Sequence, residues 1–484
     1  MKQTKIIATV GPASDKVETL LAMVEQGVDV FRLNMSHGSH AYHKQIIENI
    51  KLIRQSFQGA KPAILVDLQG PKIRIGTFLN DETIQLEEGQ AFELSLLHPL
   101  DEGTQTCVGI DEPSLVQDVK IGQELLLADG RIVLKATEKH PDRLITEVVI
   151  GGMLSGKKGI NLKGGGLSAQ AFTEKDYHDL SFAIEHDVDF IALSFVRSLE
   201  DILQIKSIIS QNDATMSVIA KIERVEAIEN IEKIAEVSDG LMIARGDLAL
   251  EVGLAKVPGL QKRIIQVSKK YDCFSIVATQ MMESMVHAQT PTRAEVSDVA
   301  NAIEDQVDAV MLSEETAVGD HPLKVIAHMH AICCEELLLN EKAYMLVNNL
   351  ECDATRVITL NGCYIAKDLM AAALVLFTEK GRTAFFSSRS GLRIPIFGLS
   401  QQIKTCLKMN ILRGVAPILV DFSKHDLQSL NQLAVEVLLA NEKVTNPDTV
   451  VIIKGDLVGV SGHTNAIEVW TVADLLMHHQ KNYA

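Results

Sequence analysis

Short runs of apolar residues recur along the first two-thirds of the chain, and each run ends in a polar or charged residue. Runs that are apolar throughout predict strands buried on both faces, as in a parallel sheet. Because helical lengths of chain separate most of these runs, the pattern predicts an eight-stranded (β/α)8 barrel. The eight runs begin near Lys5, Asp29, Ala63, Phe190, Ser217, Gly240, Phe274 and Asp308.

The polar residues that end these runs are predicted to lie together at one rim of the barrel. Barrels of this kind keep their chemistry at the carboxyl ends of the strands. The strand ends therefore define a candidate active site. They carry Arg32, Asn34, Asp67, Ser194, Lys221, Glu223, Asp247, Thr279 and Ser313.

The spacing of the strands is interrupted once, between Ala63 and Phe190, by short runs of alternating polarity. One of them, ELLLADGRIVLKA, contains Asp129-Gly130 as a hairpin turn. We therefore expect a small all-β domain at 70–168, inserted after the third strand of a barrel formed by 1–69 and 169–345. Glycine-rich segments at its two ends, GPKIRIG and NLKGGGLS, predict hinges and hence a mobile lid.

The last part of the chain, 346–484, follows a helical pattern that starts at Pro322 and contains five further strand-like runs. Five strands cannot close a second eight-stranded barrel, so the pattern predicts a doubly wound α/β domain. The expected strands are 373–378, 394–400, 415–420, 449–455 and 466–472.

Composition narrows the class of partner. The 484 residues are 46% hydrophobic and carry a formal net charge of −17, which disfavours nucleic acid and anionic membrane as partners. Neither a signal sequence nor an apolar run long enough to span a bilayer is found, so a cytoplasmic location is expected. The seven Cys are scattered, which indicates reduced thiols rather than disulfides or a zinc site.

Two carboxylates, Glu223 and Asp247, end neighbouring predicted strands, and two hard oxygen donors suit Mg²⁺. The alternative is a salt-bridge cluster, because Lys221 lies two residues before Glu223 on the same strand face. Gly246 opens the next helix, where free amides can bind a carboxylate or phosphate. It is equally compatible with a simple tight turn.

Donors suited to phosphate oxygens gather in FRLNMSHGSH, with Arg32, Asn34 and Ser36, and in GPKIR, with Arg74. Three histidines, His37, His40 and His43, share this region with a spacing that allows either metal binding or, as we expect, solvated side chains. A divalent cation, a lysine and arginines under a lid suit phosphoryl transfer and enolate chemistry equally well.

Eight segments, in order along the chain, resemble the signature segments of pyruvate kinases. They are FRLNMSHG, DLQGPKIR, KKGINL, IAKIERVEAIENI, MIARGDLALEVG, ATQMMESM, PTRAEVSDVANA and MLSEETA. The resemblance covers essentially the whole chain and implies a TIM barrel that transfers the phosphoryl group of phosphoenolpyruvate to ADP.

The resemblance also implies residue roles. Glu223 and Asp247 would hold Mg²⁺, which Mn²⁺ can replace, and Lys221 would neutralise the transferred phosphoryl group. The substrate would also meet Arg32, Gly246, Thr279 and Ser313, with Lys221, Arg32 and Thr279 as the catalytic residues. The nucleotide side would be formed by Asn34, Ser36, His37, Arg74 and, from the lid, Lys158.

Many pyruvate kinases need K⁺, bound beside positions matching Asn34, Ser36 and Asp67, with an acidic residue at the position of Lys72. This sequence departs from that pattern, because Leu68 has no side-chain oxygen and Lys72 brings a tethered positive charge. We therefore expect catalysis without K⁺.

The segment TEKGRT, with Thr378, Lys380, Arg382 and Thr383, leaves a strand and opens a helix, where one phosphate can be cradled. By family analogy it binds an effector, a phosphorylated sugar or nucleotide; the alternative is a glycine turn capped by Thr383. Family analogy also predicts a homotetramer.

Two other functions remain open from the residues alone. A Mg²⁺-dependent aldolase or lyase would use the same carboxylates and an enolate, without ADP or the lid lysine. A non-catalytic phosphate sensor is the second alternative, although Arg32, Lys221, Glu223, Asp247 and Thr279 are all present.

Overall fold

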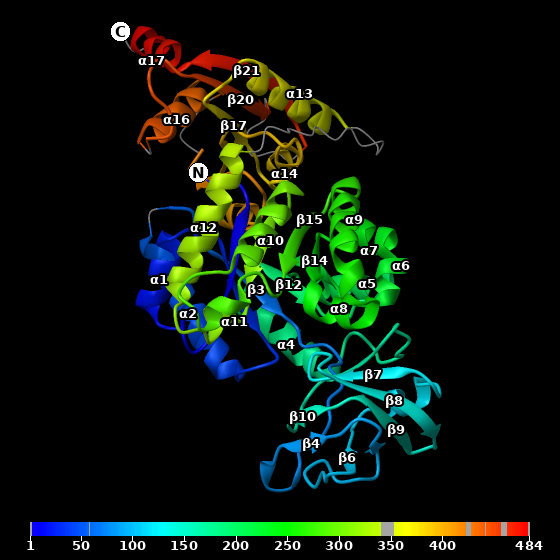
Figure 1. Ribbon diagram of the computed structural model, residues 1–484. Coiled ribbons are helices and arrows are strands. Elements are labelled where there is room, and N and C mark those ends of the chain that lie inside the picture. The colour runs from blue at the N-terminus through cyan, green and yellow to red at the C-terminus, as the bar shows by residue number, and fades with distance from the viewer. Residues whose placement is uncertain are drawn as a thin grey trace.

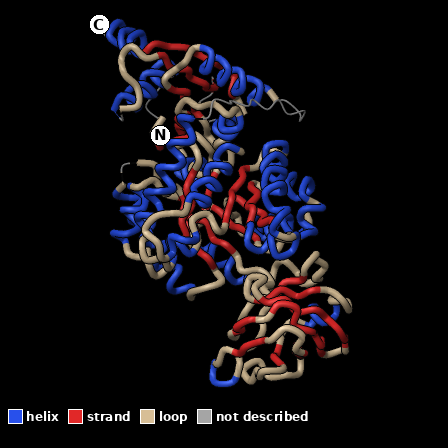
Figure 2. The backbone as a smooth tube through the Cα atoms, viewed as in Figure 1, coloured by secondary structure: helices blue, strands red, loops and turns tan. Residues whose placement is uncertain are grey.

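The structure is a computed structural model that describes residues 2–57, 59–339, 353–422, 427–440, 442–455 and 462–482. Its three parts follow one another in space (Figure 1): the C-terminal α/β part at the top, the barrel in the middle and the β-rich insertion at the bottom. Figure 2 shows strands gathered inside a ring of helices in the middle part, whereas the lower part consists of strands and loops with little helix.

The barrel closes in the order β1-β16-β15-β14-β13-β12-β3-β2, and all neighbouring strands are parallel. The predicted (β/α)8 barrel is therefore confirmed. The strands are β1 (Lys5–Thr9), β2 (Val30–Asn34), β3 (Ala63–Asp67), β12 (Phe190–Leu193), β13 (Ser217–Ile222), β14 (Gly240–Ala244), β15 (Phe274–Ala278) and β16 (Ala309–Leu312).

Both faces of the barrel strands are buried, which explains their continuous apolar sequence. Alternate residues such as Leu65 and Ile219 fill the barrel interior, while their neighbours Val66 and Ala220 pack under the surrounding helices. The main helices of that ring are α1 (Val17–Glu25), α2 (His40–Ser56), α4 (Glu174–Glu185), α5 (Leu199–Gln211), α7 (Ile231–Val237), α9 (Val257–Lys270), α10 (Arg293–Glu304) and α12 (Pro322–Leu339).

The insertion between β3 and β12 has its own core and a six-stranded sheet in the order β11-β7-β8-β9-β5-β6, beside the pair β10-β4. The expected hairpin is present, since Asp129 and Gly130 take left-handed φ values of 57° and 81° in its turn. The elements are β4 (Ile84–Leu86), β5 (Ala91–Ser95), β6 (Cys107–Gly109), α3 (Pro113–Asp118), β7 (Glu124–Leu127), β8 (Ile132–Lys139), β9 (Arg143–Ile150), β10 (Gly152–Leu154) and β11 (Ile160–Leu162).

The C-terminal part is the expected doubly wound unit, with strand order β19-β18-β17-β20-β21 and only β21 antiparallel. Helices α13 to α15 pack on one face of the sheet, and α16 and α17 pack on the other. The elements are α13 (Ala354–Asp368), β17 (Ala373–Phe377), α14 (Arg382–Arg389), β18 (Ile396–Ser400), α15 (Ile403–Met409), β19 (Val415–Leu419), α16 (Leu427–Ala440), β20 (Thr449–Gly455), β21 (Thr464–Thr471) and α17 (Val472–Asn482).

The C-terminal part closes the floor of the barrel, because one apolar cluster runs from the barrel interior into this sheet. Polar contacts fix the same junction: the Lys5 Nζ donates to the Val415 carbonyl at 2.6 Å, and Arg389 pairs with the fully buried Asp308. The opposite rim, toward the insertion, is left for ligands. The predicted boundary at 345/346 lies outside the described residues.

Within the described part of the chain, no helix combines the length and the apolar composition needed to cross a bilayer.

Candidate active site

A buried group of charges stands at the carboxyl ends of β2, β3 and β13. Asp67 accepts a 2.8 Å hydrogen bond from the Arg32 Nε at its Oδ2, and its Oδ1 lies 3.3 Å from the Lys221 Nζ. The Lys221 Nζ also donates to the Ser194 Oγ at 2.6 Å and lies 3.6 Å from the Glu223 Oε2. The five residues that the sequence placed on four different strands therefore form one cluster.

Burial sets the electrostatics of this cluster. Burial alone lowers the pKa of Lys221, but Asp67 and Glu223 outweigh it, so the pKa is raised above its ordinary value. Burial likewise tends to raise the pKa of Asp67, yet Lys221 and Arg32 hold it below its usual range. Lys221 is thus a permanent ammonium, unsuited to act as a base.

Glu223 has the opposite tendency. Burial raises its pKa, the nearby Asp247 adds to the rise, and Lys221 only partly opposes it. Its Oε1 accepts a 2.6 Å hydrogen bond from the Phe195 amide, whereas its Oε2 is buried without a hydrogen-bond donor. A charged, half-satisfied carboxylate in this position is costly unless another cation joins it.

These donors fit a magnesium ion. The orphaned Glu223 Oε2 and the half-buried Asp247 supply two hard oxygens, which is the protein share that Mg²⁺ commonly takes. Among the described residues no group of three or more His, Cys, Asp or Glu is arranged to hold a metal. The predicted salt bridge between Lys221 and Glu223 is also present, so it accompanies the proposed metal pair rather than excluding it.

Helix α8 (Arg245–Val252) begins directly after β14 and brings Gly246 beside Thr279. The Gly246 amide donates to the Thr279 Oγ1 at 2.8 Å. Thr279 and Gln280 both have positive φ values, 68° and 54°, which cost energy in non-glycine residues. The Arg245 guanidinium holds this strained turn, donating to the Thr279 carbonyl at 2.8 Å and to the Gln280 carbonyl at 3.2 Å.

Ser313 is placed by a residue that sequence reasoning missed. The buried Glu315 accepts hydrogen bonds from the Ser313 amide at 2.6 Å and from the Met282 amide at 3.2 Å. It therefore ties the turn after β16 to the loop after β15. Glu315 belongs to the MLSEETA segment, but nothing in that segment distinguishes it from the exposed Glu314.

The expected nucleotide residues lie on two facing segments. The Asn34 side chain accepts from the Ser36 amide at 3.1 Å, which shapes the loop after β2. His37 follows, and its pKa is lowered by partial burial and by the positive charges of Arg74 and Lys72. Arg74 donates to the Lys157 carbonyl at 2.9 Å, so it joins the first linker to the lid loop on which Lys158 is exposed.

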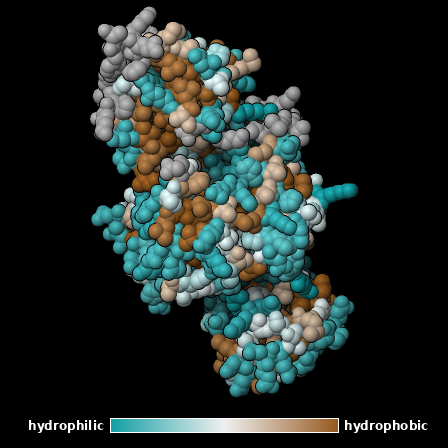
Figure 3. Space-filling view, turned by 90° about the vertical axis from the view of Figure 1, so that its left-hand side faces the viewer, coloured by the Kyte–Doolittle hydropathy of each residue, from teal (hydrophilic) through white to brown (hydrophobic). Residues whose placement is uncertain are grey.

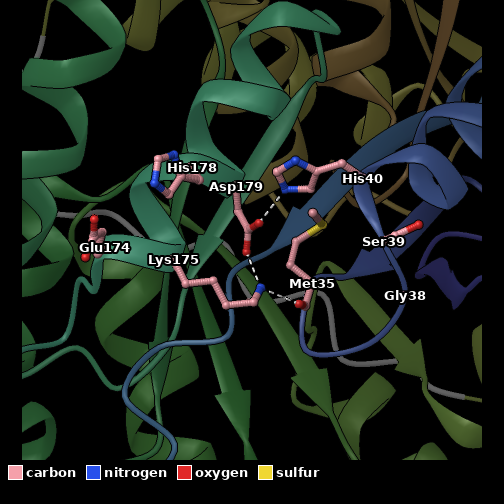
Figure 4. A pocket seen from close by; sticks show the side chains of 8 residues that line it. All are labelled: Met35, Gly38, Ser39, His40, Glu174, Lys175, His178 and Asp179. Atoms are coloured by element: carbon pink, nitrogen blue, oxygen red, sulfur yellow. Dashed lines mark hydrogen bonds and ion pairs between the residues drawn. The ribbon is translucent and has the colours of Figure 1, made fainter.

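A cavity of about 450 Å³ opens beside the loop that follows β2, between α2 and α4. Figure 4 shows Lys175 and His40 converging on Asp179 from opposite sides. The Lys175 Nζ donates to the Met35 carbonyl at 2.7 Å and to the Asp179 Oδ2 at 2.6 Å. Sequence reasoning missed Lys175, because only the tertiary structure brings α4 to the loop after β2.

The expectation of solvated histidines is wrong for His43. Its side chain is buried on the inner face of α2, and its Nε2 lies 2.8 Å from the His37 carbonyl. His40 stacks on Phe182, with 4.6 Å between ring centroids, and contacts Asp179 at 2.7 Å. Both rings therefore shape the loop that carries Asn34 and Ser36.

The expected effector residues lie far from this rim, at the start of α14. Gly381 takes a left-handed φ of 81°, and its amide donates to the Thr378 Oγ1 at 3.0 Å. Lys380 is exposed, whereas Arg382 pairs with Asp353. The Thr383 Oγ1 lies 3.1 Å from the Thr464 Oγ1 on β21.

Family models, curated relatives and a solved structure that resemble this chain all belong to the same family. The family described as "Pyruvate kinase, barrel domain" matches residues 1–326, and "Pyruvate kinase, alpha/beta domain" matches residues 356–470. The pyruvate kinase of Thermotoga maritima is 39% identical over 98% of this chain and 100% of its own length. A pyruvate kinase of Buchnera aphidicola (subsp. Schizaphis graminum) is 40% identical over 98% and 99%.

A solved structure of a pyruvate kinase from Cryptosporidium parvum has a TM-score of 0.90 and 28% sequence identity, covering 97% of this chain and 96% of the other. The matches extend over the barrel, the insertion and the C-terminal sheet alike. The chain therefore belongs to the pyruvate kinase family of phosphotransferases.

Proposed function

We propose that this protein transfers the phosphoryl group of phosphoenolpyruvate to ADP in the cytoplasm, producing pyruvate and ATP. The observation that carries the proposal is the Lys221 ammonium, which lies 3.3 Å from Asp67 and 3.6 Å from a Glu223 oxygen that has no hydrogen-bond donor. Such a site concentrates positive charge where a phosphoryl group and an enolate oxygen need it. An aldolase would not require the nucleotide residues that follow β2 beside this cluster.

In this proposal Glu223 and Asp247 hold Mg²⁺, or Mn²⁺ in its place, and the ion neutralises charge on the substrate when bound. Lys221 lies against the transferred phosphoryl group. Its position between two carboxylates keeps its ammonium charged, so it can neutralise negative charge on that group. Arg32 is aimed by its bonds to Asp67 and to the Thr9 hydroxyl, at 2.9 Å, and binds phosphate oxygens.

The carboxylate of the substrate binds at the start of α8. The Gly246 amide donates to the Thr279 hydroxyl there, the Asp247 amide follows it in the first turn, and amides at a helix start favour an anion. Thr279 and Ser313 supply hydroxyls near the carbon that is finally protonated. The Thr279 hydroxyl now donates to the Ala278 carbonyl at 2.6 Å, so it must rotate to reach a substrate.

The nucleotide binds between the barrel and the lid. Asn34, Ser36 and His37 line its barrel side, Arg74 and Lys158 meet its phosphates, and the cavity beside Lys175 receives the rest of the molecule. Lid closure would exclude water, which otherwise competes with ADP for the phosphoryl group.

Charge neutralisation by Lys221 gives the first prediction. Lys221→Ala should lower turnover at least about 100-fold while ADP affinity stays nearly unchanged, because the ammonium acts on the transferred group. ADP-dependent pyruvate formation in a coupled assay, with EDTA as the metal-free reference, measures turnover. Lys206→Ala, which removes an ion pair with Asp239 away from the rim, is the matched control. Near-normal turnover in Lys221→Ala would refute the assignment, and pyruvate release without ADP would favour a lyase.

The structure supports catalysis without K⁺. Both oxygens of Asp67 already face cations, Arg32 and Lys221, and the side chain of Leu68 is buried. Lys72 stands close enough to the loop after β2 for its charge to lower the pKa of His37. In this proposal the tethered ammonium of Lys72 supplies the positive charge that a monovalent cation would otherwise provide.

Full activity is therefore expected in sodium or tetramethylammonium salts. The measurement is the same coupled assay with potassium replaced, and Lys72→Glu is the informative variant, since it should become dependent on added potassium. A large activation of the unaltered protein by potassium would defeat this proposal.

We also propose that the loop containing Thr378, Lys380, Arg382 and Thr383 binds a phosphorylated sugar or nucleotide that activates the enzyme. The left-handed Gly381 turns the chain sharply before α14, and the exposed Lys380 stands beside the helix start. Between Asp421 and Asn446 the sequence has two permanent cations, Lys424 and Lys443, and Lys424 lies outside the described residues. Glucose 6-phosphate and AMP should lower the KM for phosphoenolpyruvate, and Thr383→Glu should abolish the response. An equal response in this variant would place the effector elsewhere.

A homotetramer is proposed for the assembly. Strand β21 forms an open edge of the C-terminal sheet with Val469 45% exposed, and α13 beside it exposes Val357 and Tyr364. Figure 3 shows apolar side chains also on the upper part of the molecule, on the side that faces left in Figure 1. Light scattering after gel filtration should give four chain masses, and Val469→Lys should reduce that mass. A monomer in the unaltered protein would contradict the proposal.

A further inference from the structure

The lid joins the barrel through two linkers. The second linker, 163–168, contains three glycines whose backbone angles other residues rarely adopt. Gly164, Gly165 and Gly166 have φ values of 91°, 74° and 102°, all left-handed. Such a segment has little stiffness of its own. Its course must therefore be fixed by contacts with the barrel.

Three hydrogen bonds supply those contacts. The Gly164 amide donates to the Glu251 carbonyl at 3.0 Å, and the Gly166 amide donates to the Glu226 Oε1 at 2.7 Å. The Arg224 Nη2 donates to the Leu167 carbonyl at 2.8 Å. The linker is thus bound at both ends and in its middle.

The groups that bind the linker also bind one another. The Arg224 Nε lies 3.3 Å from the Glu226 Oε2 and 3.6 Å from the Glu251 Oε1, and the Glu251 Oε2 accepts from the Val225 amide at 2.9 Å. Arg224 and Glu251 are only 3% and 5% exposed. A guanidinium between two carboxylates away from water is held strongly and in a fixed orientation.

The group formed by Arg224, Glu226 and Glu251 lies between the two linkers and the catalytic rim. A cavity of about 20 Å³, room for one water, is lined by Pro71 and Ile73 of the first linker and by Leu167, Arg224 and Glu251. Arg224 directly follows Glu223, and Glu251 lies in the last turn of α8, which begins at the substrate amides. The same two elements that carry the proposed metal ligands therefore carry the linker contacts.

We propose that Arg224 and Glu251 are positioning residues that lock the second linker and so set where the lid places Arg74 and Lys158 over the nucleotide. The inference depends on the phosphoryl transfer proposed above. Neither residue touches the substrates. Their effect is expected on ADP binding, because the lid groups meet ADP, and not on phosphoenolpyruvate, which binds to the barrel.

The test compares Arg224→Gln and Glu251→Gln with two matched controls, Lys270→Gln and Glu232→Gln, which break an exposed ion pair on the outer wall of the barrel. Arg224→Gln and Glu251→Gln, called the hinge variants below, should each raise the KM for ADP about tenfold. They should change the KM for phosphoenolpyruvate less than about twofold. Arg224→Lys, which keeps the charge and one donor, should recover part of the loss. Controls should match the unaltered protein.

A readout independent of catalysis is tryptic cleavage after Lys163, followed by mass spectrometry. Cleavage there should quicken at least about fivefold in the hinge variants, while cleavage after the exposed Lys158 of the same lid stays constant. Unchanged cleavage at Lys163, or parallel rises in the KM for ADP and the KM for phosphoenolpyruvate, would overturn the proposal that Arg224 and Glu251 hold the second linker. A protein that forms no ATP would overturn the proposed function, yet its cleavage pattern would still decide the lock.

Discussion

The active-site rim depends on one constraint, the cost of keeping several charges out of water at the mouth of the barrel. Asp67 and Glu223 are nearly inaccessible, and the side chains of Arg32 and Lys221 are only 10% and 13% exposed. The positive charges hold Asp67 ionised, and the carboxylates hold Lys221 charged. One Glu223 oxygen is left without a hydrogen-bond donor and lies 3.6 Å from the Lys221 Nζ.

The barrel meets this constraint by drawing each charge from a different strand end. Parallel strands place their last residues at the same rim, and the apolar interior below excludes water from the floor of the site. The C-terminal sheet closes the other end, with Lys5 and Arg389 crossing the junction. Rigid support at one end of the barrel and a separate β domain at the other suit a reaction in which positioning does most of the work.

Helix α8 connects these functions within eight residues. Its first turn presents Gly246 and Asp247, Arg245 holds the strained Thr279, and Glu251 at its end contacts the lid linker. A short helix that is bonded at both ends moves as a unit. The start of α8 and the lid linker therefore share one rigid support, which fixes the position of one relative to the other.

The barrel, the inserted β domain, the C-terminal sheet and the strand-end residues can all be predicted from the amino-acid sequence, because periodicity and turn residues report local structure directly. Which of those residues touch one another depends on how the elements pack. This packing buries His43, brings Lys175 to the loop after β2, and joins Arg224 to Glu251 and Leu167. These contacts link residues distant in the chain, and their energies depend on burial and orientation, which no local pattern encodes.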